Sequence, residues 1–158
     1  MTGLPNTHPT QAVEPYDWPE LLKLIQIEFA YMDGRIDPPS SMHRLTAEDI
    51  ARQARTEEVW TIGAPPIACV FLTCKGDALY IGKLAVSASQ RGKGLAKKLV
   101  DLAANRAKDR GLSILELQVR VELTENHTAF AKMGFVEAGR TAHEGYDRPT
   151  SITMRKHL

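Results

Sequence analysis

The sequence has little of the material that metal sites and disulfide-stabilised folds require. Its 158 residues include two cysteines and five histidines. Cys69 and Cys74 stand an odd number of positions apart in one predicted strand, so their side chains should point to opposite faces of a sheet. No group of Cys and His has metal-ligand spacing. We therefore expect no disulfide and no bound metal, as in proteins of a reducing compartment.

Charge of one sign and long apolar runs are also lacking. The 20 Lys and Arg residues nearly balance the 19 Asp and Glu residues, which leaves a net charge of +1 at pH 7. With so little excess positive charge and no interleaved aromatic residues, nucleic-acid binding is not expected. No apolar run is long enough to span a membrane, and residues 1–10 do not resemble a signal peptide. A cytoplasmic protein without membrane contact is the expectation.

The length fits one domain. The chain shows no internal repeat and no linker-like segment, and 158 residues suffice for one hydrophobic core. Residues 1–9 are polar and contain proline, which is typical of a flexible tail. We therefore expect a single domain over residues 10–158.

Two helices are predicted in the first third of the chain. Asp17 offers an N-cap, and apolar residues then recur at helical spacing over residues 18–32. Residues 33–41 are rich in Gly, Pro and Ser, which indicates a loop. Thr46 and Asp49 have the spacing of a capping box, which predicts a short second helix after them.

The rest of the chain is predicted to form a sheet with helices between some of its strands. Short turns separate the first strands, which predicts an antiparallel meander. A long amphipathic helix from Leu95 to a stop at Gly111 then forms a crossover, so the strands before and after it should be parallel. A shorter helix capped by Thr124 ends near Met133. The predicted strands cover residues 10–13, 59–62, 67–73, 79–86, 114–120, 135–142 and 151–155.

A glycine-rich loop precedes the long helix, with the sequence Gln90-Arg91-Gly92-Lys93-Gly94-Leu95-Ala96. Its backbone N–H groups and the positive end of the helix dipole would meet at one point, which favours an anion. Arg91 and Lys93 add positive charge there. A ligand that carries phosphate groups is therefore expected at this loop.

Two common phosphate-binding loops fit this segment poorly. A mononucleotide loop needs Lys and then Ser or Thr after its last glycine, but Gly94 is followed by Leu95. A dinucleotide loop needs a third glycine where Lys97 stands, and a tighter connection to its strand. Glu116 does stand about where a dinucleotide-binding protein contacts the ribose, so that alternative stays open. A glycine pair that only forms a turn is the third alternative.

The loop and the strand end before it resemble the signature of the GNAT acetyltransferase superfamily. The family pattern is Arg or Gln, two residues, Gly, one residue, and then Gly or Ala, after a Leu-x-Val strand end. Arg91, Gly94 and Ala96 match this pattern, and the helix that ends at Gly134-Phe135 is also similar to the family. The order of elements agrees over about residues 10–157.

The resemblance implies an α/β (α+β) fold of the GNAT type. Such a fold has a mixed, mostly antiparallel central sheet of six to seven strands with about four flanking helices. Two parallel strands splay apart in it, and here these would be residues 79–86 and 114–120.

The resemblance also implies acetyl-CoA as the co-substrate, without a metal. Backbone groups at the strand end would pair with the pantetheine amides, and N–H groups of the loop would bind the pyrophosphate. Two residues of the shorter helix would also contact the cofactor. The implied cofactor-binding residues are Leu84, Ala85, Val86, Arg91, Gly92, Lys93, Gly94, Leu95, Ala96, Asn126 and Phe130.

The implied reaction is direct attack of an amine on the thioester, which needs a base and often an acid. Glu116 is the candidate base, and a structural strand residue is the alternative. Many relatives carry a tyrosine acid at the position of Phe130, which cannot donate a proton. Tyr146, in the loop before the last strand, is the candidate replacement, and an ordinary loop aromatic is the alternative.

The acceptor site implied by the family lies between the loop after the first helix and the loop before the last strand. Its candidate residues are Tyr31, Asp33, Arg35 and His143. The acceptor would be an amine of a small molecule, of a protein N-terminus or of a lysine. Dimers are common in the family, which makes a homodimer one expected assembly. Because Phe130 removes the usual acid, a non-catalytic domain that binds acyl-CoA is the alternative function.

Overall fold

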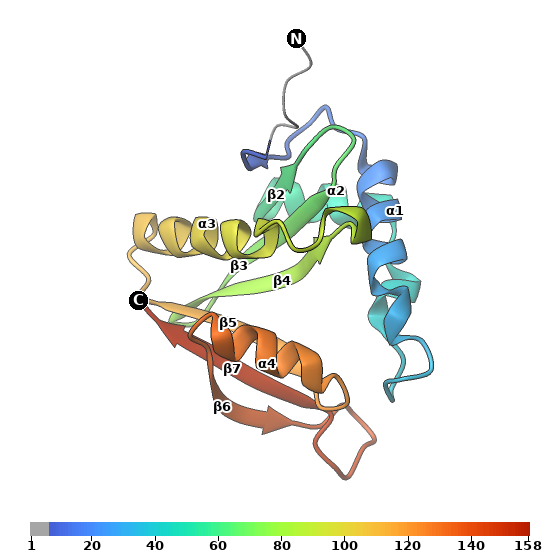
Figure 1. Ribbon diagram of the computed structural model, residues 1–158, viewed down its shortest axis with the longest axis vertical. Coiled ribbons are helices and arrows are strands. Elements are labelled where there is room, and N and C mark those ends of the chain that lie inside the picture. Colours follow the sequence, from blue (N-terminus) through green and yellow to red (C-terminus); the bar gives the residue numbers. More distant parts are fainter. Residues whose placement is uncertain (1–6) are drawn as a thin grey trace.

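The computed structural model describes residues 7–158 and arranges them around one seven-stranded sheet (Figure 1). The first six residues of the expected tail lie outside this range. The strand order is β1-β2-β3-β4-β5-β7-β6, and only the β4–β5 pair is parallel. The strands are β1 (Thr10–Gln11), β2 (Glu58–Ile62), β3 (Ala68–Lys75), β4 (Ala78–Val86), β5 (Ile114–Arg120), β6 (Val136–Thr141) and β7 (Ser151–His157).

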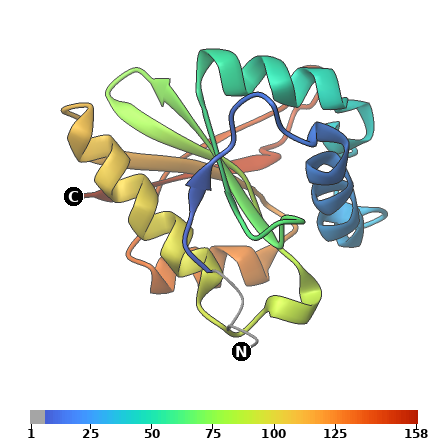
Figure 2. The same cartoon turned by 90° about the horizontal axis from the view of Figure 1, so that it is seen from above.

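Helices cover both faces of the sheet, as Figure 2 shows from above. Helices α1 and α2 pack on one face, and α3 and α4 lie on the other. The α-helices are α1 (Trp18–Phe29), α2 (Ala47–Thr56), α3 (Leu95–Asp109) and α4 (Thr124–Lys132). Short 3₁₀ turns are η1 (Ala30–Met32), η2 (Ser41–Arg44) and η3 (Ala88–Gln90). This arrangement confirms the predicted mixed, mostly antiparallel sheet with four helices.

The predicted helix caps at the N-terminal end are confirmed. The Asp17 carboxylate accepts the backbone N–H of Glu20 at 3.2 Å and so satisfies one free donor at the start of α1. Thr46 and Asp49 form the capping box in both directions, at 3.1 and 3.0 Å. Each cap depends on residues three positions apart, which is why the local sequence predicts it.

The prediction that Thr124 caps α4 is wrong. Leu123 occupies the N-cap position, and its carbonyl accepts the backbone N–H groups of Asn126 and His127 at 3.0 and 3.4 Å. Thr124 is therefore already inside the first helical turn, where its hydroxyl cannot reach the free N–H groups that a cap satisfies. The helix begins without a side-chain cap.

Each face of the sheet has its own hydrophobic core. On the α3 face, Leu99 and Ala103 of the helix are fully buried against Val70 and Leu115 of the sheet. On the other face, α1 and α2 pack against residues such as Phe71. The strands alternate between these cores, which is the expected period of two. The predicted orientation of the cysteines is also confirmed, because Cys69 is buried, Cys74 is exposed and both are free thiols.

The parallel strands β4 and β5 separate soon after they meet. They pair at Leu79 with Leu115 and at Tyr80 with Glu116, and beyond these residues they share no further register. Strand β5 instead pairs with β7 over its whole length. Figure 1 shows β4 and β5 diverging from this meeting point. The predicted splay is therefore confirmed, and it opens the sheet at the side where β4 leads into the glycine loop.

A bulge in β4 lies on the open side of this splay. Cys69 and Phe71 of β3 face Ala85 and Gly82 of β4, so two residues of β4 stand opposite one residue of β3. One of them, Lys83, has a φ of +48°, which is uncommon for a residue with a side chain. A bulge bends its strand and increases its twist, so this one turns β4 further from β5.

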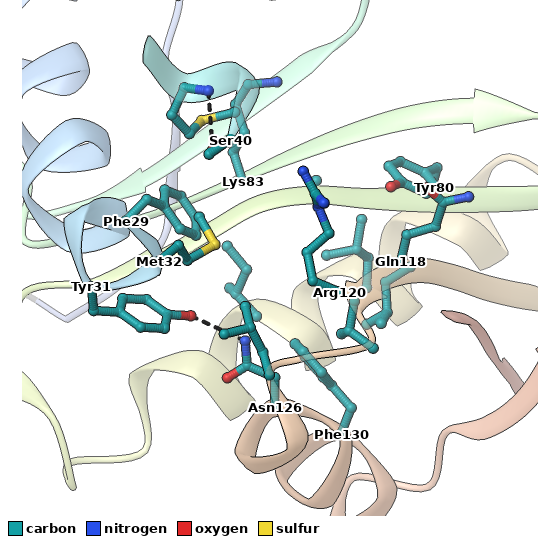
Figure 3. Close-up of a pocket in the computed structure, with 17 residues that line it drawn as sticks. Phe29, Tyr31, Met32, Ser40, Tyr80, Lys83, Gln118, Arg120, Asn126 and Phe130 are labelled. Atoms are coloured by element: carbon teal, nitrogen blue, oxygen red, sulfur yellow. Dashed lines mark hydrogen bonds between the residues drawn. The ribbon is translucent and has the colours of Figure 1, made fainter. Parts of the chain in front are cut away.

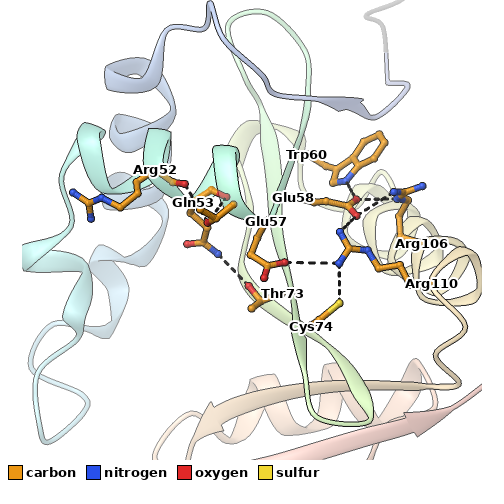
Figure 4. A network of polar contacts seen from close by, with 10 residues as sticks. Arg52, Gln53, Glu57, Glu58, Trp60, Thr73, Cys74, Arg106 and Arg110 are labelled. Carbon is orange, nitrogen blue, oxygen red and sulfur yellow. Dashed lines mark hydrogen bonds and ion pairs between the residues drawn. The ribbon is translucent and has the colours of Figure 1, made fainter.

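A buried carboxylate holds α3 against β2 (Figure 4). Glu58 is 3% exposed and accepts hydrogen bonds from Arg106 at 2.8 and 3.1 Å, from Trp60 at 2.8 Å and from Arg110. Burial acts to raise the pKa of the Glu58 carboxyl, but the hydrogen bonds from Arg106, Trp60 and Arg110 outweigh burial and lower the pKa from 4.5 to about 2. The charged form therefore stabilises the fold.

We predict that the Glu58 contacts make the stability of the protein depend on pH. The folded pKa is lower than the unfolded pKa, so the stabilisation is complete above the unfolded value and is lost as pH falls toward the folded value. Glu58→Gln should lower the free energy of unfolding at pH 7 by about 2 to 3 kcal/mol. Urea unfolding from about pH 5 down to about pH 2.5 should show a smaller loss of stability for the variant than for the wild type.

The matched control is Glu137→Gln, which removes an ion pair with Arg140 in which both side chains are about half exposed. Solvent screens such a pair, so this variant should behave like the wild type. An equal loss of stability between these pH values in the wild type and Glu58→Gln would contradict the prediction.

Candidate functional site

A cavity of about 260 Å³ lies where β4 and β5 diverge (Figure 3). We refer to it as the splay cavity. Its walls come from β4, from β5 and its C-terminal end, from α4, and from the segment between α1 and α2. The residues that matter below are Tyr31, Ser40, Tyr80, Lys83, Leu84, Gln118, Arg120, Asn126 and Phe130.

Polar and aromatic residues of two elements meet at one end of the splay cavity. Asn126 of α4 donates a hydrogen bond from Nδ2 to the hydroxyl oxygen of Tyr31 at 3.0 Å. Because the Tyr31 oxygen is the acceptor in this bond, its own hydrogen stays available for another partner. Figure 3 shows Tyr31 and Asn126 directed toward one another, with Phe130 beside them. Phe130 packs edge-on against Phe135, with ring centroids 5.9 Å apart.

The glycine loop has the backbone shape that an anion site needs. Gly92 and Gly94 have φ angles of +80° and +77°, in the left-handed region that favours glycine. Gly94 is the N-cap of α3 and offers no side chain to the first helical N–H groups. A Cβ added at either glycine would meet nothing within 4 Å, so the space over the loop is open. An anion could therefore approach these N–H groups directly.

The side chains of the loop have different surroundings. Leu95 is 3% exposed and belongs to the hydrophobic core, so only its backbone could contact a ligand. Lys93 bonds Gln90 at 3.0 Å on the surface. The Arg91 guanidinium forms an ion pair with Glu28 at 2.7 Å.

The contact between Glu28 and Arg91 was not predicted from the sequence. Glu28 is 8% exposed and lies in α1, so it links this helix to the glycine loop. A signal for it was present, since Leu21, Ile25 and Glu28 follow helical spacing and Glu28 therefore falls on the buried stripe of α1. A carboxylate on such a stripe indicates a buried partner of opposite charge.

The structure does not bring Glu116, the predicted base, to the splay cavity. Glu116 is 5% exposed and lies where β4 and β5 are still paired. Its carboxylate accepts a hydrogen bond from Arg155 at 2.9 Å and pairs with Lys75 at 3.4 Å. These two cations compensate the negative charge of Glu116. The role of a structural strand residue therefore describes Glu116 better than the role of a catalytic base.

Tyr146, the predicted acid, also lies outside the lining of the splay cavity. Its hydroxyl donates to the Asp37 carboxylate at 2.6 Å, and Arg148 lies 3.3 Å from the same carboxylate. The hydrogen bond to Asp37 raises the pKa of Tyr146. These contacts join the loop between β6 and β7 to the segment between α1 and α2, so Tyr146 has a structural role in holding two loops together.

The predicted acceptor residues do not all line the same cavity. Tyr31 lines the splay cavity, as described above. Arg35 forms a two-point ion pair with Glu125 at 2.7 and 2.9 Å, and Asp33 pairs with His43 at 2.6 Å. The charges of Arg35 and Asp33 are thus engaged in ion pairs, and neither residue lines the splay cavity.

His143 lines a second cavity of about 400 Å³, which we refer to as the adjoining cavity. The two cavities share several polar residues, so they meet between the start of β4 and the C-terminal part of β5. Basic residues are present in both linings, and neither lining includes Asp or Glu. The adjoining cavity is lined by Ser40, Arg44, Tyr80, Gln118, Arg120 and His143, among others.

Residues 7–158 contain neither a cluster of metal ligands nor a helix that could span a membrane. In this range, no three or more His, Cys, Asp or Glu side chains lie close enough together to hold a metal ion. None of the helices in the same range combines the length and the apolar character that crossing a membrane requires.

Comparison with known proteins identifies the family. Residues 18–135, more than half of the chain, match the acetyltransferase (GNAT) family. The chain belongs to this family. The predicted family and fold are therefore confirmed, and the dinucleotide-binding alternative is ruled out.

One curated relative matches over part of the chain. N-alpha-acetyltransferase 30 of Saccharomyces cerevisiae is 34% identical over 82 residues, which cover 48% of this chain and 46% of that protein. The matching segment thus spans about half the length of this relative.

Solved structures of the same fold match nearly the whole chain. The PaiA N-acetyltransferase of Thermoplasma acidophilum, in complex with coenzyme A, has a TM-score of 0.77 at 13% identity and covers 96% of this chain and 98% of its own. The ribosomal-protein-S18-alanine N-acetyltransferase of Escherichia coli has a TM-score of 0.68 at 19% identity, with 95% and 94% covered. At such identities, the likeness establishes the fold.

We predict that Gly94→Asp weakens the binding of coenzyme A by about a hundredfold or more, because the new carboxylate would repel a pyrophosphate over the loop. Calorimetric titration with coenzyme A measures the effect. The matched control is Gly76→Asp in the β3–β4 hairpin, since Gly76 is also left-handed, with a φ of +62°, and also open. Equal affinity of the two variants would contradict the location of the site.

Proposed function

We propose that the protein transfers an acetyl group from acetyl-CoA to a primary amine. The observation that carries this proposal is the arrangement of the open side of the sheet. The glycine loop lies at the end of β4, the splay cavity lies between β4 and β5, and the adjoining cavity continues from it. A long, thin molecule with a phosphate group at one end and a reactive acyl group at the other fits this order.

Binding of the cofactor would use mainly backbone groups. The N–H groups from Arg91 to Ala96 would hold the pyrophosphate, because Gly92 and Gly94 leave the space above them open. Leu84, Ala85 and Val86 would offer their backbone to the pantetheine amides, since the β5 side of β4 has no strand partner there. Asn126 and Phe130 of α4 would flank the thioester end.

Tyr31 is the best-placed acid for the departing thiolate. It lines the splay cavity together with Leu84 and Phe130, and Asn126 fixes its oxygen while leaving its hydrogen free. Tyr31 would thus supply the proton that Phe130 cannot supply. This assignment replaces Tyr146, whose hydroxyl is bound to Asp37.

The acceptor is proposed to be a primary amine of a peptide or of a small molecule. The names of two relatives, N-alpha-acetyltransferase 30 and ribosomal-protein-S18-alanine N-acetyltransferase, point to protein N-termini for those proteins. An α-amine of a peptide is therefore the first acceptor to test for this chain. A homodimer and a cytoplasmic location stay predictions.

The test is an acceptor panel with labelled acetyl-CoA. It contains peptides with a free α-amine, peptides with a blocked α-amine and one lysine, and small aliphatic amines. Mass spectrometry should show one acetyl group on the amine of at least one class, with one coenzyme A released for each. Tight binding of coenzyme A without acetylation of any amine would favour the non-catalytic acyl-CoA-binding domain instead.

We predict that Tyr31→Phe lowers kcat for the best acceptor by about tenfold or more, because the thiolate would leave without a proton donor. The affinity for coenzyme A should change little, since the aromatic ring is kept. The control is Tyr146→Phe, which removes a hydroxyl bound to Asp37 outside the splay cavity. A similar kcat for Tyr31→Phe and the wild type would remove Tyr31 from the mechanism.

A further inference from the structure

The imidazole of His143 is held in one orientation by a buried threonine. Thr150 is fully buried, and its hydroxyl accepts the backbone N–H of His143 at 2.9 Å. The same hydroxyl donates to the carbonyl of Thr141 at 3.4 Å and is hydrogen-bonded to His143 Nδ1. Thr150 directly precedes β7, so these bonds connect the ring to the sheet. His143 itself lies in the loop that follows β6.

These bonds favour one tautomer of the neutral ring. A threonine hydroxyl has one hydrogen, and Thr150 gives it to the carbonyl of Thr141. With the hydroxyl hydrogen on that carbonyl, the bond between Thr150 and Nδ1 uses a hydrogen on Nδ1. The other nitrogen, Nε2, then carries a lone pair, and within residues 7–158 it makes no hydrogen bond. Such an imidazole can accept a proton at Nε2.

The surroundings favour the neutral form of this imidazole. Burial lowers the pKa of His143 below 6.5, the positive charge of Arg120 lowers it further, and Glu122 acts in the opposite direction. Arg44 of η2 is another cation in the lining of the same cavity. The proton acceptor is therefore available at the pH where an amine is mostly a protonated ammonium.

The adjoining cavity gives His143 access to the reaction. His143 shares this cavity with Tyr80, Gln118 and Arg120, which also line the splay cavity. No Asp or Glu lines either cavity, and Glu116 is neutralised elsewhere by Arg155 and Lys75. His143 is the one imidazole in the two linings and has an ordinary pKa near neutral pH, whereas the other basic side chains there, Lys83, Arg44 and Arg120, are ordinarily cations.

We propose that His143 is the general base that removes a proton from the ammonium group of the acceptor, directly or through one water. The ammonium N–H bond breaks, and its proton moves to Nε2. The neutral amine then attacks the carbonyl carbon of the thioester, a C–N bond forms and the C–S bond breaks. Tyr31 gives its proton to the departing sulfur and takes up the second N–H proton of the attacking amine, and the imidazolium releases its proton to solvent. This proposal rests on the acetyl transfer proposed above.

The first test measures the tautomer without any reaction. In protein with ¹⁵N-labelled histidine, the His143 signals are assigned by their loss in His143→Gln. They should show a neutral ring with the hydrogen on Nδ1 and a titration midpoint below pH 6.5. A hydrogen on Nε2 would overturn the proposal. Since no acceptor is present, this result is independent of whether the protein transfers acetyl groups.

The second test is the pH dependence of kcat/KM for the best acceptor of the panel. The wild type should lose activity below the titration midpoint of His143. In His143→Gln, activity at pH 7 should fall by about a hundredfold or more, and the acidic limb should move up to the pKa of the acceptor amine, because only amine that is already neutral can react. An acidic limb at the same pH in both proteins would overturn the proposal.

Two sets of matched variants separate catalysis from general damage. His43→Gln removes a histidine that is paired with Asp33 and does not line the adjoining cavity, so its profile should match the wild type. Thr150→Ser keeps the hydroxyl, so the acidic limb of its profile should stay at the pH of the wild type. Thr150→Val removes the hydroxyl and should lower kcat/KM. Equal kcat/KM for the Ser and Val variants would overturn the role of Thr150 as the positioning residue.

Discussion

The location of the site depends on the different lengths over which the two edges of β5 pair with their neighbouring strands. One edge pairs with β7 along the whole strand, while the other pairs with β4 only as far as Tyr80 and Glu116. Adjacent strands of a sheet twist, and the bulge at Lys83 adds to the twist of β4. The strands therefore separate, and their unpaired backbone groups face an opening instead of each other. The splay cavity, the exposed backbone of β4 and the approach from the glycine loop all follow from this separation.

The buried carboxylates of the protein lie outside the linings of the two cavities. Glu28, Glu58 and Glu116 are all buried, and each is paired with at least one arginine. These pairs join α1 to the glycine loop, α3 to β2, and β5 to β7. Their charges are thus used for the fold, and the linings of the two cavities contain apolar, basic and neutral polar residues but no carboxylate. An anionic cofactor gains from this arrangement, because no carboxylate in the lining opposes it.

Apart from the cap expected at Thr124, features set by neighbouring residues could be predicted from the sequence, and features set by distant residues could not. The caps at Asp17 and Thr46, the parallel crossover and the glycine loop each depend on short-range patterns, and all are present in the structure. The roles of Glu116 and Tyr146 depend on partners 39 and 109 positions away. A strand pattern gives the face on which a side chain lies, but it does not identify which charge lies opposite.

The proposed acetyl transfer requires that coenzyme A occupies the opening between β4 and β5. Amide hydrogen exchange along β4 tests this directly, because a bound pantetheine would cover backbone groups that lack a strand partner. On addition of coenzyme A, exchange should slow in residues 84–86 and in the loop up to Ala96. It should stay unchanged in residues 78–80, where β4 already pairs with β5. Slower exchange in the loop alone, with no change in residues 84–86, would contradict the account.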